Sequence, residues 1–467
     1  MAEKQIQYKK ASMYYLVGNL FNKGMAFLTV PIFTRILSTT DYGIVTTFNS
    51  WVAILTMVIS FAIHMGIRAA FIDYREHVDD VMSVTTTFTL LSAALLSLFV
   101  SLGVILLKVN VGMILVVLCL LQGLASAIIQ NYSMYLMMRY RYKFRTVLLI
   151  SPNLISACIS VVAILFVIKS DLYMGRIIPT ALVTFAFGIL IVILVYKKSH
   201  VFYNKRYLQY TIAISAPLVL HGIALNILSQ SDRTMITWLA DASQTGIYSL
   251  IYNFSMIATV IMTSLDGVWV PWFTEKMIIG DTKSINVLAK DYINLMTYAM
   301  FCLILIGPEI VKILADSRYW EGIDIIPPIV LTNYVIFAYT LYVNIEHFHK
   351  RTIYITINTL IAATTNIVLN FLFIPKFGYV AAAYTTLVSY ILAFVLHARY
   401  SKKLEPDIYP LKSFKRPILH ISASVVLFYM LNLYALVRWG IVIIYILLML
   451  IREKGRIVSF FPSLARR

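Results

Sequence analysis

The chain has 467 residues, of which 60% are hydrophobic and only 13% are charged, and its formal net charge is +18. An average soluble domain carries about 25% charged residues, whereas here apolar runs of about 20 residues, each long enough to cross a bilayer, repeat along the chain. Lys and Arg cluster in short segments between these runs, which is typical of membrane topology and argues against a nucleic-acid partner. We therefore predict an all-α polytopic membrane protein.

The apolar runs predict about fourteen transmembrane helices. The first run follows Lys4, Lys9 and Lys10, is too long for a signal peptide and has no cleavage site, so we expect it to be retained as a span. The last two runs are short and closely joined, which leaves open whether they form two spans. In chain order the predicted spans are 11–37, 43–66, 82–107, 112–138, 146–168, 173–196, 210–238, 246–271, 289–314, 325–347, 352–374, 379–399, 415–434 and 436–451.

The distribution of positive charge predicts how these spans are oriented. If the N-terminus is cytoplasmic, the inner segments hold 29 of the 39 Lys and Arg residues and the outer segments hold seven, while Lys23, Arg233 and Lys312 fall within spans. Because Lys and Arg are enriched in cytoplasmic loops, we predict that both termini are cytoplasmic.

The two halves of the chain share an internal repeat. A shift of 203 residues carries the first predicted helix onto the seventh and aligns Ser12 with Ser215, Gly43 with Gly246, Thr56 with Thr259, and Gly175 with Gly378. Six helices separate the copies, which predicts two six-helix bundles in the same orientation, as in transporters built from parallel repeats. We expect bundles at 1–200 and 201–403, followed by two additional helices and a basic cytoplasmic tail at 404–467.

Polar residues at helical spacing mark candidate binding positions inside the spans. The first helix carries Asn19, Asn22 and Lys23 on one face, and the seventh carries Asn226, Gln230 and Arg233. Such stripes either join helices by hydrogen bonds or line a hydrated cavity, and their presence in both halves favours the cavity. Lys23 lies roughly 18 Å along its helix, too deep to reach an interface easily, which makes it the foremost functional candidate.

The neighbouring charges Asp232 and Arg233 are harder to assign. Arg233 lies near the outer end of its span beside Trp238, so it either lines the cavity or extends to the interface. Adjacent residues on a helix point about 100° apart, so Asp232 should face other surroundings. As titratable groups that could couple transport to an ion we single out Asp232, Asp266, His221 and His64, although each could equally be a hydrogen-bonded residue of the bundle.

The sequence contains no recognisable catalytic motif. We find no Walker A, no GxGxxG after a strand, no HExxH and no CxxC, and the predicted loops are too short to hold a soluble catalytic domain. We therefore expect a protein that is not an enzyme and needs no cofactor or metal. Energy for transport would come from an ion gradient or from the substrate's own concentration difference.

Four segments resemble a known family. These are PIFTRILSTTDYGIVTTF at the end of the first helix, SDRTMITWLADASQTGIYSLIYNF, KILADSRYWEGIDIIPPIVL and FGYVAAAYTTLVSY. Over about residues 10–400 the chain resembles Wzx-type polysaccharide repeat-unit flippases of the multidrug/oligosaccharidyl-lipid/polysaccharide (MOP) exporter superfamily. The resemblance implies alternating access that moves a polyprenyl-pyrophosphate-linked oligosaccharide from the cytoplasmic to the outer leaflet of the bacterial cytoplasmic membrane, for assembly of a surface polysaccharide such as O-antigen or capsule.

The resemblance also implies a cationic cavity, because the pyrophosphate and acidic sugars need counter-charge in a low dielectric. Lys23 and Arg233 could supply that charge, with Arg35 as a weaker third candidate, and the Asn and Gln residues of the stripes suit sugar hydroxyls. The expected partners are the lipid-linked substrate and membrane lipid, with a polysaccharide polymerase and chain-length machinery as further candidates.

Other functions remain open at the level of sequence. A peptidoglycan-precursor flippase would also suit fourteen helices, whereas a multidrug or cation antiporter should carry deep carboxylates, and Asp232 and Asp266 lie toward span ends. A membrane polymerase or glycosyltransferase is a remote alternative, since it needs larger outer loops than the short ADSRYWEGID segment.

Overall fold

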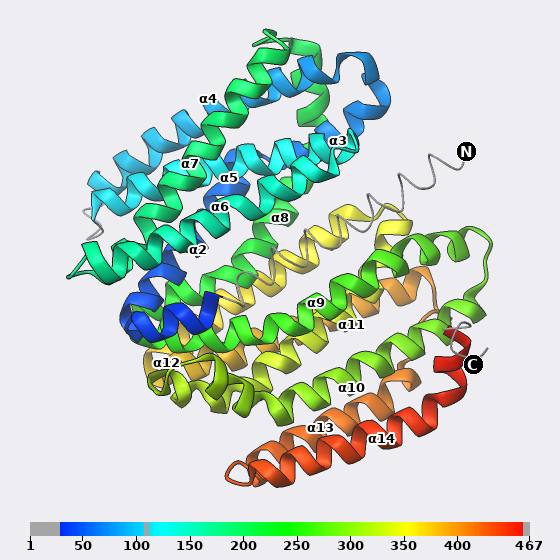
Figure 1. Cartoon of the computed structure of the whole chain (residues 1–467). Helices are drawn as coiled ribbons and strands as arrows, with labels where there is room; N and C mark the ends of the chain where they lie inside the picture. The colour runs from blue at the N-terminus through cyan, green and yellow to red at the C-terminus, as the bar shows by residue number, and fades with distance from the viewer. Residues whose placement is uncertain (1–28, 107–111, 461–467) are drawn as a thin grey trace. The chain divides into compact units, whose positions relative to one another are not determined.

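The computed structural model describes residues 29–106 and 112–460, and every regular element in these ranges is a helix (Figure 1). Ten of the described helical segments are long and apolar enough to cross a membrane, as judged by length and composition. The predicted class, an all-α polytopic membrane protein, is therefore confirmed. The total of about fourteen spans and the cytoplasmic location of both termini stay predictions.

The chain divides into two compact units, and each is interleaved in sequence. Unit 1 comprises the residues up to Ser249 together with Thr352–Ala382, and unit 2 comprises Leu250–Arg351 together with the residues from Ala383 onward. Two helices, α9 (Ala242–Ile278) and α12 (Thr352–Leu404), pass from one unit into the other. The two units are defined by which helices pack together, whereas the predicted bundles at 1–200 and 201–403 are defined by the repeat. The units therefore do not test the bundle boundaries, which stay a prediction.

Unit 1 is built from long antiparallel helices joined by short connections. Besides the first residues of α9 and the first part of α12, it contains α2 (Thr39–Ser60), α3 (Ile63–Asp73), η1 (Arg75–His77), α4 (Val78–Leu106), α5 (Met113–Met138), α6 (Tyr142–Val162), the π-helical turn η2 (Ala163–Val167), α7 (Leu172–Lys198) and α8 (Lys205–Leu239).

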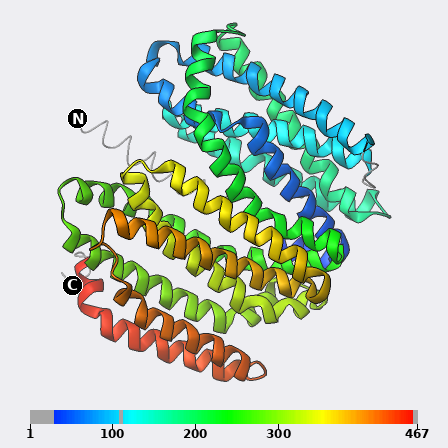
Figure 2. The same ribbon diagram turned by 180° about the vertical axis from the view of Figure 1, so that it is seen from behind.

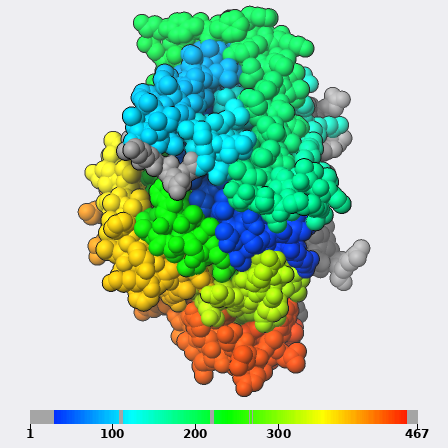
Figure 3. All heavy atoms as spheres, turned by 90° about the vertical axis from the view of Figure 1, so that its left-hand side faces the viewer, coloured from blue at the N-terminus to red at the C-terminus, as the bar shows by residue number. Residues whose placement is uncertain are grey.

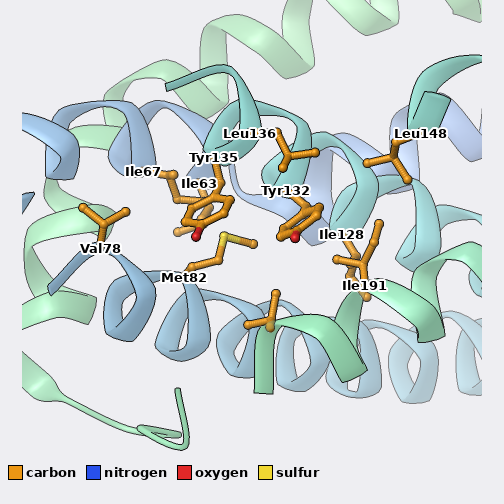
Figure 4. Close-up of a cluster of buried hydrophobic side chains, with 11 residues drawn as sticks. Ile63, Ile67, Val78, Met82, Ile128, Tyr132, Tyr135, Leu136, Leu148 and Ile191 are labelled. Carbon is orange, nitrogen blue, oxygen red and sulfur yellow. The ribbon is translucent and has the colours of Figure 1, made fainter. Parts of the chain in front are cut away.

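One hydrophobic cluster lies among α3 to α7 of unit 1. On α5, Tyr132, Tyr135 and Leu136 are spaced so that they share a face, and they contact buried aliphatic side chains from the neighbouring helices (Figure 4). The remaining members are Ile63, Ile67, Val78, Met82, Ile128, Leu148, Ile191 and Val195. The cluster therefore fixes the helices of unit 1 against one another.

Unit 2 contains the second part of α9, α10 (Thr282–Leu314), η3 (Ser317–Ile325), α11 (Ile326–Phe348), the second part of α12, η4 (Leu411–Phe414), α13 (Lys415–Met430) and α14 (Ala435–Phe460). The helices α13 and α14 form a hairpin that packs on α10, as both ribbon views show (Figures 1 and 2). In the space-filling view the orange surface of this hairpin adjoins the yellow-green end of α10 (Figure 3).

Local chemistry explains where several helices begin. Ser38 and Asp41 form a reciprocal capping box at the start of α2, and Asn204 caps α8. Asp281 caps α10 by accepting from the backbone N–H of Ser284. Hydrogen bonds from Lys276, 2.9 Å away, and from Ser284 lower the pKa of Asp281 to about 2, so this cap stays ionised at physiological pH.

The predicted span at 43–66 is interrupted in the structure. Phe61 and Ala62, with φ of 48° and 50°, separate α2 from α3. Non-glycine residues rarely adopt this left-handed conformation, and residues 44–65 include neither Gly nor Pro, so nothing in the sequence around Phe61 and Ala62 indicates the break. The carbonyl oxygen of Ala62 accepts hydrogen bonds from the backbone N–H of Met65 at 3.0 Å and from the buried Ser215 hydroxyl at 3.1 Å.

Candidate functional site

The segments that the 203-residue shift relates contact each other inside unit 1. A Cβ atom at Gly43 would lie 1.7 Å from the carbonyl oxygen of Ala242, and one at Gly246 would lie 2.1 Å from that of Thr39. Thr39 and Ala242 are themselves 203 residues apart, so the two contacts are reciprocal, as expected around a two-fold axis. The glycines therefore let α2 and α9 approach to backbone contact.

A hydrogen bond crosses the same contact between residues that are 203 apart. The buried Ser249 hydroxyl of α9 donates to the Thr46 hydroxyl of α2 at 3.0 Å. The polar turns before the two helices also act alike, because Asp41 accepts from the backbone N–H of Tyr173 at 3.2 Å and Gln244 accepts from that of Tyr379 at 3.0 Å. These contacts support the predicted parallel repeat.

Gly378, next to the Tyr379 N–H that Gln244 binds, is a further position where the contact requires glycine. Its φ is +58°, and a Cβ there would lie 2.0 Å from the Gln244 amide oxygen that binds the Tyr379 N–H. The same residue breaks α12 into two helices, as the sequence predicted for spans 352–374 and 379–399.

A buried polar network surrounds Asp232 on α8. The carboxyl group accepts a hydrogen bond from the Tyr248 hydroxyl of α9 at 2.6 Å and from the Asn370 amide of α12 at 2.7 Å. Asn366, one turn from Asn370, accepts from Asn370 at 3.3 Å and from Ser231 at 3.2 Å. Asp232 is 1% exposed and both Asn residues are fully buried, so this is a desolvated polar site in unit 1.

Arg233, the next residue, faces a different set of groups. Its guanidinium donates to the Ser229 carbonyl oxygen at 3.2 Å and to the Gln230 amide oxygen at 2.9 Å. Gln230 also accepts from the Ser50 hydroxyl of α2 at 3.2 Å. Arg233 is only 7% exposed, whereas the nearby Trp238 is 61% exposed. The side chain is therefore held within unit 1 rather than extended toward the outer interface.

The other predicted site residues are placed as follows. Lys23, Asn19 and Asn22 lie outside the described residues, and so does the side chain of His221. Asn226 donates to the Gly222 carbonyl oxygen of its own helix at 2.9 Å. Arg35 is exposed, His64 is partly buried at the start of α3, and Asp266 is partly buried in the unit 2 part of α9. The structure thus brings together Arg233 and Gln230, whereas Asp232 lies in a separate network, and the binding roles of all these residues stay predictions.

Two features of the buried polar sites were not predicted from the sequence. One is the set of partners of Asp232: Tyr248 lies on the next helix, 16 residues away, and Asn370, which belongs to a polar stripe of the predicted span 352–374, is 138 residues away. In unit 2 the carboxyl group of Glu346 and the imidazole of His397 form a buried pair. Glu346 and His397 both fall inside predicted apolar spans, and an ionisable residue in such a span was the sequence signal that could have found this pair. No group of three or more His, Cys, Asp or Glu side chains among residues 29–106 and 112–460 could hold a metal ion.

Long apolar helices that enclose buried carboxyl, guanidinium and amide groups define a polytopic helical membrane protein whose buried polar residues are candidate functional sites. The comparison with known sequences then assigns the family. The chain matches the polysaccharide biosynthesis protein family (Polysacc_synt) over residues 8–277, more than half of its length, and belongs to that family. The family resemblance inferred from the sequence is thereby confirmed.

One curated relative and several solved structures agree with this assignment. The chain is 23% identical over 290 residues to "Lsg locus putative protein 1" of Haemophilus influenzae, an alignment that covers 57% of this chain and 66% of that protein, just under two thirds of its length. Its fold is similar to that of the lipid II flippase MurJ in an inward closed conformation, with a TM-score of 0.66, 16% identity, and coverage of 95% of this chain and 99% of that one.

The fold is also that of other MOP-superfamily transporters. A transporter from Pyrococcus furiosus gives a TM-score of 0.55 at 11% identity, covering 85% of this chain and 96% of that one. An inward-facing multidrug resistance MATE transporter gives 0.56 at 10% identity, covering 82% and 96%. At these identities the likeness establishes a shared fold, and the solved relatives are transporters or flippases rather than enzymes.

Proposed function

We propose that this protein flips a polyprenyl-pyrophosphate-linked oligosaccharide from the cytoplasmic to the outer leaflet of the bacterial cytoplasmic membrane, for assembly of a surface polysaccharide. The observation that carries the proposal is the combination of membership in a polysaccharide biosynthesis family with a flippase fold. A lipid-linked precursor is the form of a polysaccharide building block that must cross a bilayer, and a flippase fold supplies the route.

The cation at Arg233 supports an anionic substrate. A guanidinium stays charged in any protein environment, and Arg233 is held in unit 1 by an amide and a backbone carbonyl oxygen. In a low dielectric such a group attracts a pyrophosphate or acidic sugar strongly. We assign Arg233, together with Lys23, to counter-charge for the substrate, and Gln230 and Asn226 to its hydroxyl groups.

Asp232 is the coupling group that we favour within the proposed cycle. Its carboxyl group is desolvated and accepts hydrogen bonds from the Tyr248 hydroxyl and the Asn370 amide. A buried carboxyl group of this kind changes its interactions sharply when it gains or loses a proton or a cation. It could therefore link ion binding to rearrangement of α8, α9 and α12.

A substitution experiment tests the role of the cations. The double variant Lys23→Ala/Arg233→Ala should be inserted normally but should lose most surface polysaccharide, measured by quantitative immunoblotting, while Arg318→Ala, which removes an exposed surface cation, should keep it. Normal polysaccharide output from a stably expressed double variant would refute the assignment of counter-charge.

The fold likeness to MurJ favours one second candidate, a peptidoglycan-precursor flippase. The two functions separate in a depletion strain that lacks its own lipid II flippase. Growth restored by this chain would support the peptidoglycan precursor as substrate, whereas loss of surface polysaccharide without rescue of growth supports the repeat unit.

A further inference from the structure

A second desolvated ionisable site lies in unit 2, between α11 and the second part of α12. The Nδ1 atom of His397 lies 2.9 Å from the Oε2 atom of Glu346, and the two side chains are 1% and 0% exposed. The Ser401 hydroxyl, one turn beyond His397, lies 3.4 Å from the other oxygen of Glu346 and donates to the Tyr342 carbonyl oxygen at 2.9 Å. Water is thus excluded from an acid and a base in direct contact.

The polar groups around the pair come from several helices. Tyr339 of α11 stacks on the His397 ring with centroids 5.6 Å apart, and His347 on the same helix interacts electrostatically with both members. Asp266 and Tyr252 of α9 interact electrostatically with Tyr339. Asp266 also interacts electrostatically with Tyr292 of α10. On the side of η4 the contact is apolar, because the ring of Phe414 packs against that of Phe394 of α12.

The proton content of such a pair determines its charge. With one proton between them, Glu346 and His397 are neutral overall, either as an ion pair or as two uncharged groups. Removal of that proton leaves a buried carboxylate without compensation from the imidazole, and a second proton leaves a buried imidazolium. Buried net charge of either sign is strongly disfavoured, so the closed site should retain one proton, and its loss should favour a conformation in which water reaches the pair.

A nearby surface pair shows what burial adds. His349 and Glu405 lie just beyond the same two helices, and their nitrogen and oxygen atoms are also 2.9 Å apart. Their side chains are 31% and 28% exposed, so water can stabilise each charge separately. The two pairs have the same residue types and the same nitrogen–oxygen distance, and they differ in the exposure of their side chains to water.

We propose that Glu346 and His397 form a proton-binding site whose occupancy is coupled to hydration of the end of α11 in unit 2. The proton is held while the site is closed and is exchanged with water when it opens, so that a proton gradient biases the conformational cycle. The part of this inference that concerns transport rests on the proposed flippase function, whereas the proton binding itself does not.

Infrared difference spectroscopy of the purified full-length protein tests the binding site without any substrate. On titration between about pH 5 and pH 8, the range in which histidine ordinarily changes its charge, the wild type should show a pH-dependent band of the Glu346 carboxyl group, a C=O band if the proton is on Glu346 or a shifted carboxylate band if it is on His397, and Glu346→Gln should abolish that band. His397→Asn, which keeps a hydrogen-bond donor but cannot titrate, should shift the pH at which the band changes. The control double variant His349→Gln/Glu405→Gln should keep the band. An unchanged band in Glu346→Gln would overturn the proposal.

A cellular measurement tests the coupling. Surface polysaccharide output of Glu346→Gln should fall about tenfold and should no longer respond to a protonophore, whereas His349→Gln/Glu405→Gln should behave as wild type. To exclude misfolding, Glu346→Gln/His397→Gln, which leaves no buried charge, should be inserted at the wild-type level and still lack the response. If that double variant keeps the wild-type output and protonophore response, the coupling is refuted. If the proposed flippase function is wrong, a strain without the chain should still make normal surface polysaccharide, and this result is distinct from a failure of the proton coupling.

Discussion

At the scale of single residues, the hydrogen bonds to Asp232 make a measurable prediction. The Tyr248 hydroxyl donates to this buried carboxyl group at 2.6 Å, and removing one partner of a buried polar group costs about 1–3 kcal/mol. Tyr248→Phe should therefore lower the free energy of unfolding by that amount, measured by thermal denaturation in detergent. Tyr384→Phe, which removes a hydroxyl from an exposed ring, serves as control, and equal effects of the two substitutions would refute the role of the network.

The glycine contact between α2 and α9 makes a second residue-scale prediction. Because a Cβ at Gly43 would overlap the Ala242 carbonyl oxygen, Gly43→Ala must force the helices apart, at a cost of about 1–3 kcal/mol. Gly246→Ala should behave alike, since its contact is the reciprocal one. Gly103→Ala on α4 meets no atom within 4 Å and should leave the melting temperature unchanged or raise it. A Gly43→Ala variant as stable as wild type would contradict the close approach.

At the scale of elements, an ion pair with a buried arginine joins the α13–α14 hairpin to α10. Arg438, 1% exposed, contacts the Glu309 carboxyl group of α10 and donates to the carbonyl oxygens of Leu431 and Asn432 in the hairpin turn. Breaking a buried pair by removing one partner costs about 3–5 kcal/mol. Arg438→Met should therefore detach the hairpin from α10, which limited proteolysis and thermal denaturation would detect.

An exposed ion pair provides the control for this substitution. Arg318 and Asp316 are 2.8 Å apart with side chains 47% and 33% exposed, and exposed pairs contribute at most about 1 kcal/mol. Arg318→Met should thus have little effect. Proteolysis of Arg438→Met at the wild-type rate would show that hydrophobic packing alone holds the hairpin.

The limits of the sequence are also visible at this scale. Apolar runs predicted most helices to within a few residues, and the break at Gly378 lies between the predicted spans 352–374 and 379–399. The break at Phe61 and Ala62 was missed because neither residue type indicates a left-handed backbone, and the Ser215 hydroxyl that contacts Ala62 is 153 residues away in the chain. Likewise, helical spacing predicted that Gln230 and Arg233 share a face, whereas the partners of Asp232 are supplied by tertiary packing of α9 and α12.

At the scale of the whole molecule, the chain is a helical membrane protein of the polysaccharide biosynthesis family, and its fold is similar to those of solved flippases and transporters. Each unit contains its own desolvated acid, Asp232 in unit 1 and Glu346 in unit 2. Buried acids in a membrane protein are costly and usually functional, so we propose substrate counter-charge as the role of Arg233, ion coupling as that of Asp232, and proton exchange as that of the Glu346–His397 pair.

The central claim is that the chain moves a lipid-linked oligosaccharide across the membrane. The most direct measurement quantifies polyprenyl-pyrophosphate-linked oligosaccharide by mass spectrometry in spheroplasts of a strain without the chain, before and after treatment with an impermeant glycosidase. We predict that the lipid-linked oligosaccharide accumulates in a form that the glycosidase cannot reach, and that the chain supplied in trans restores both access and surface polysaccharide. Equal access with and without the chain would contradict it.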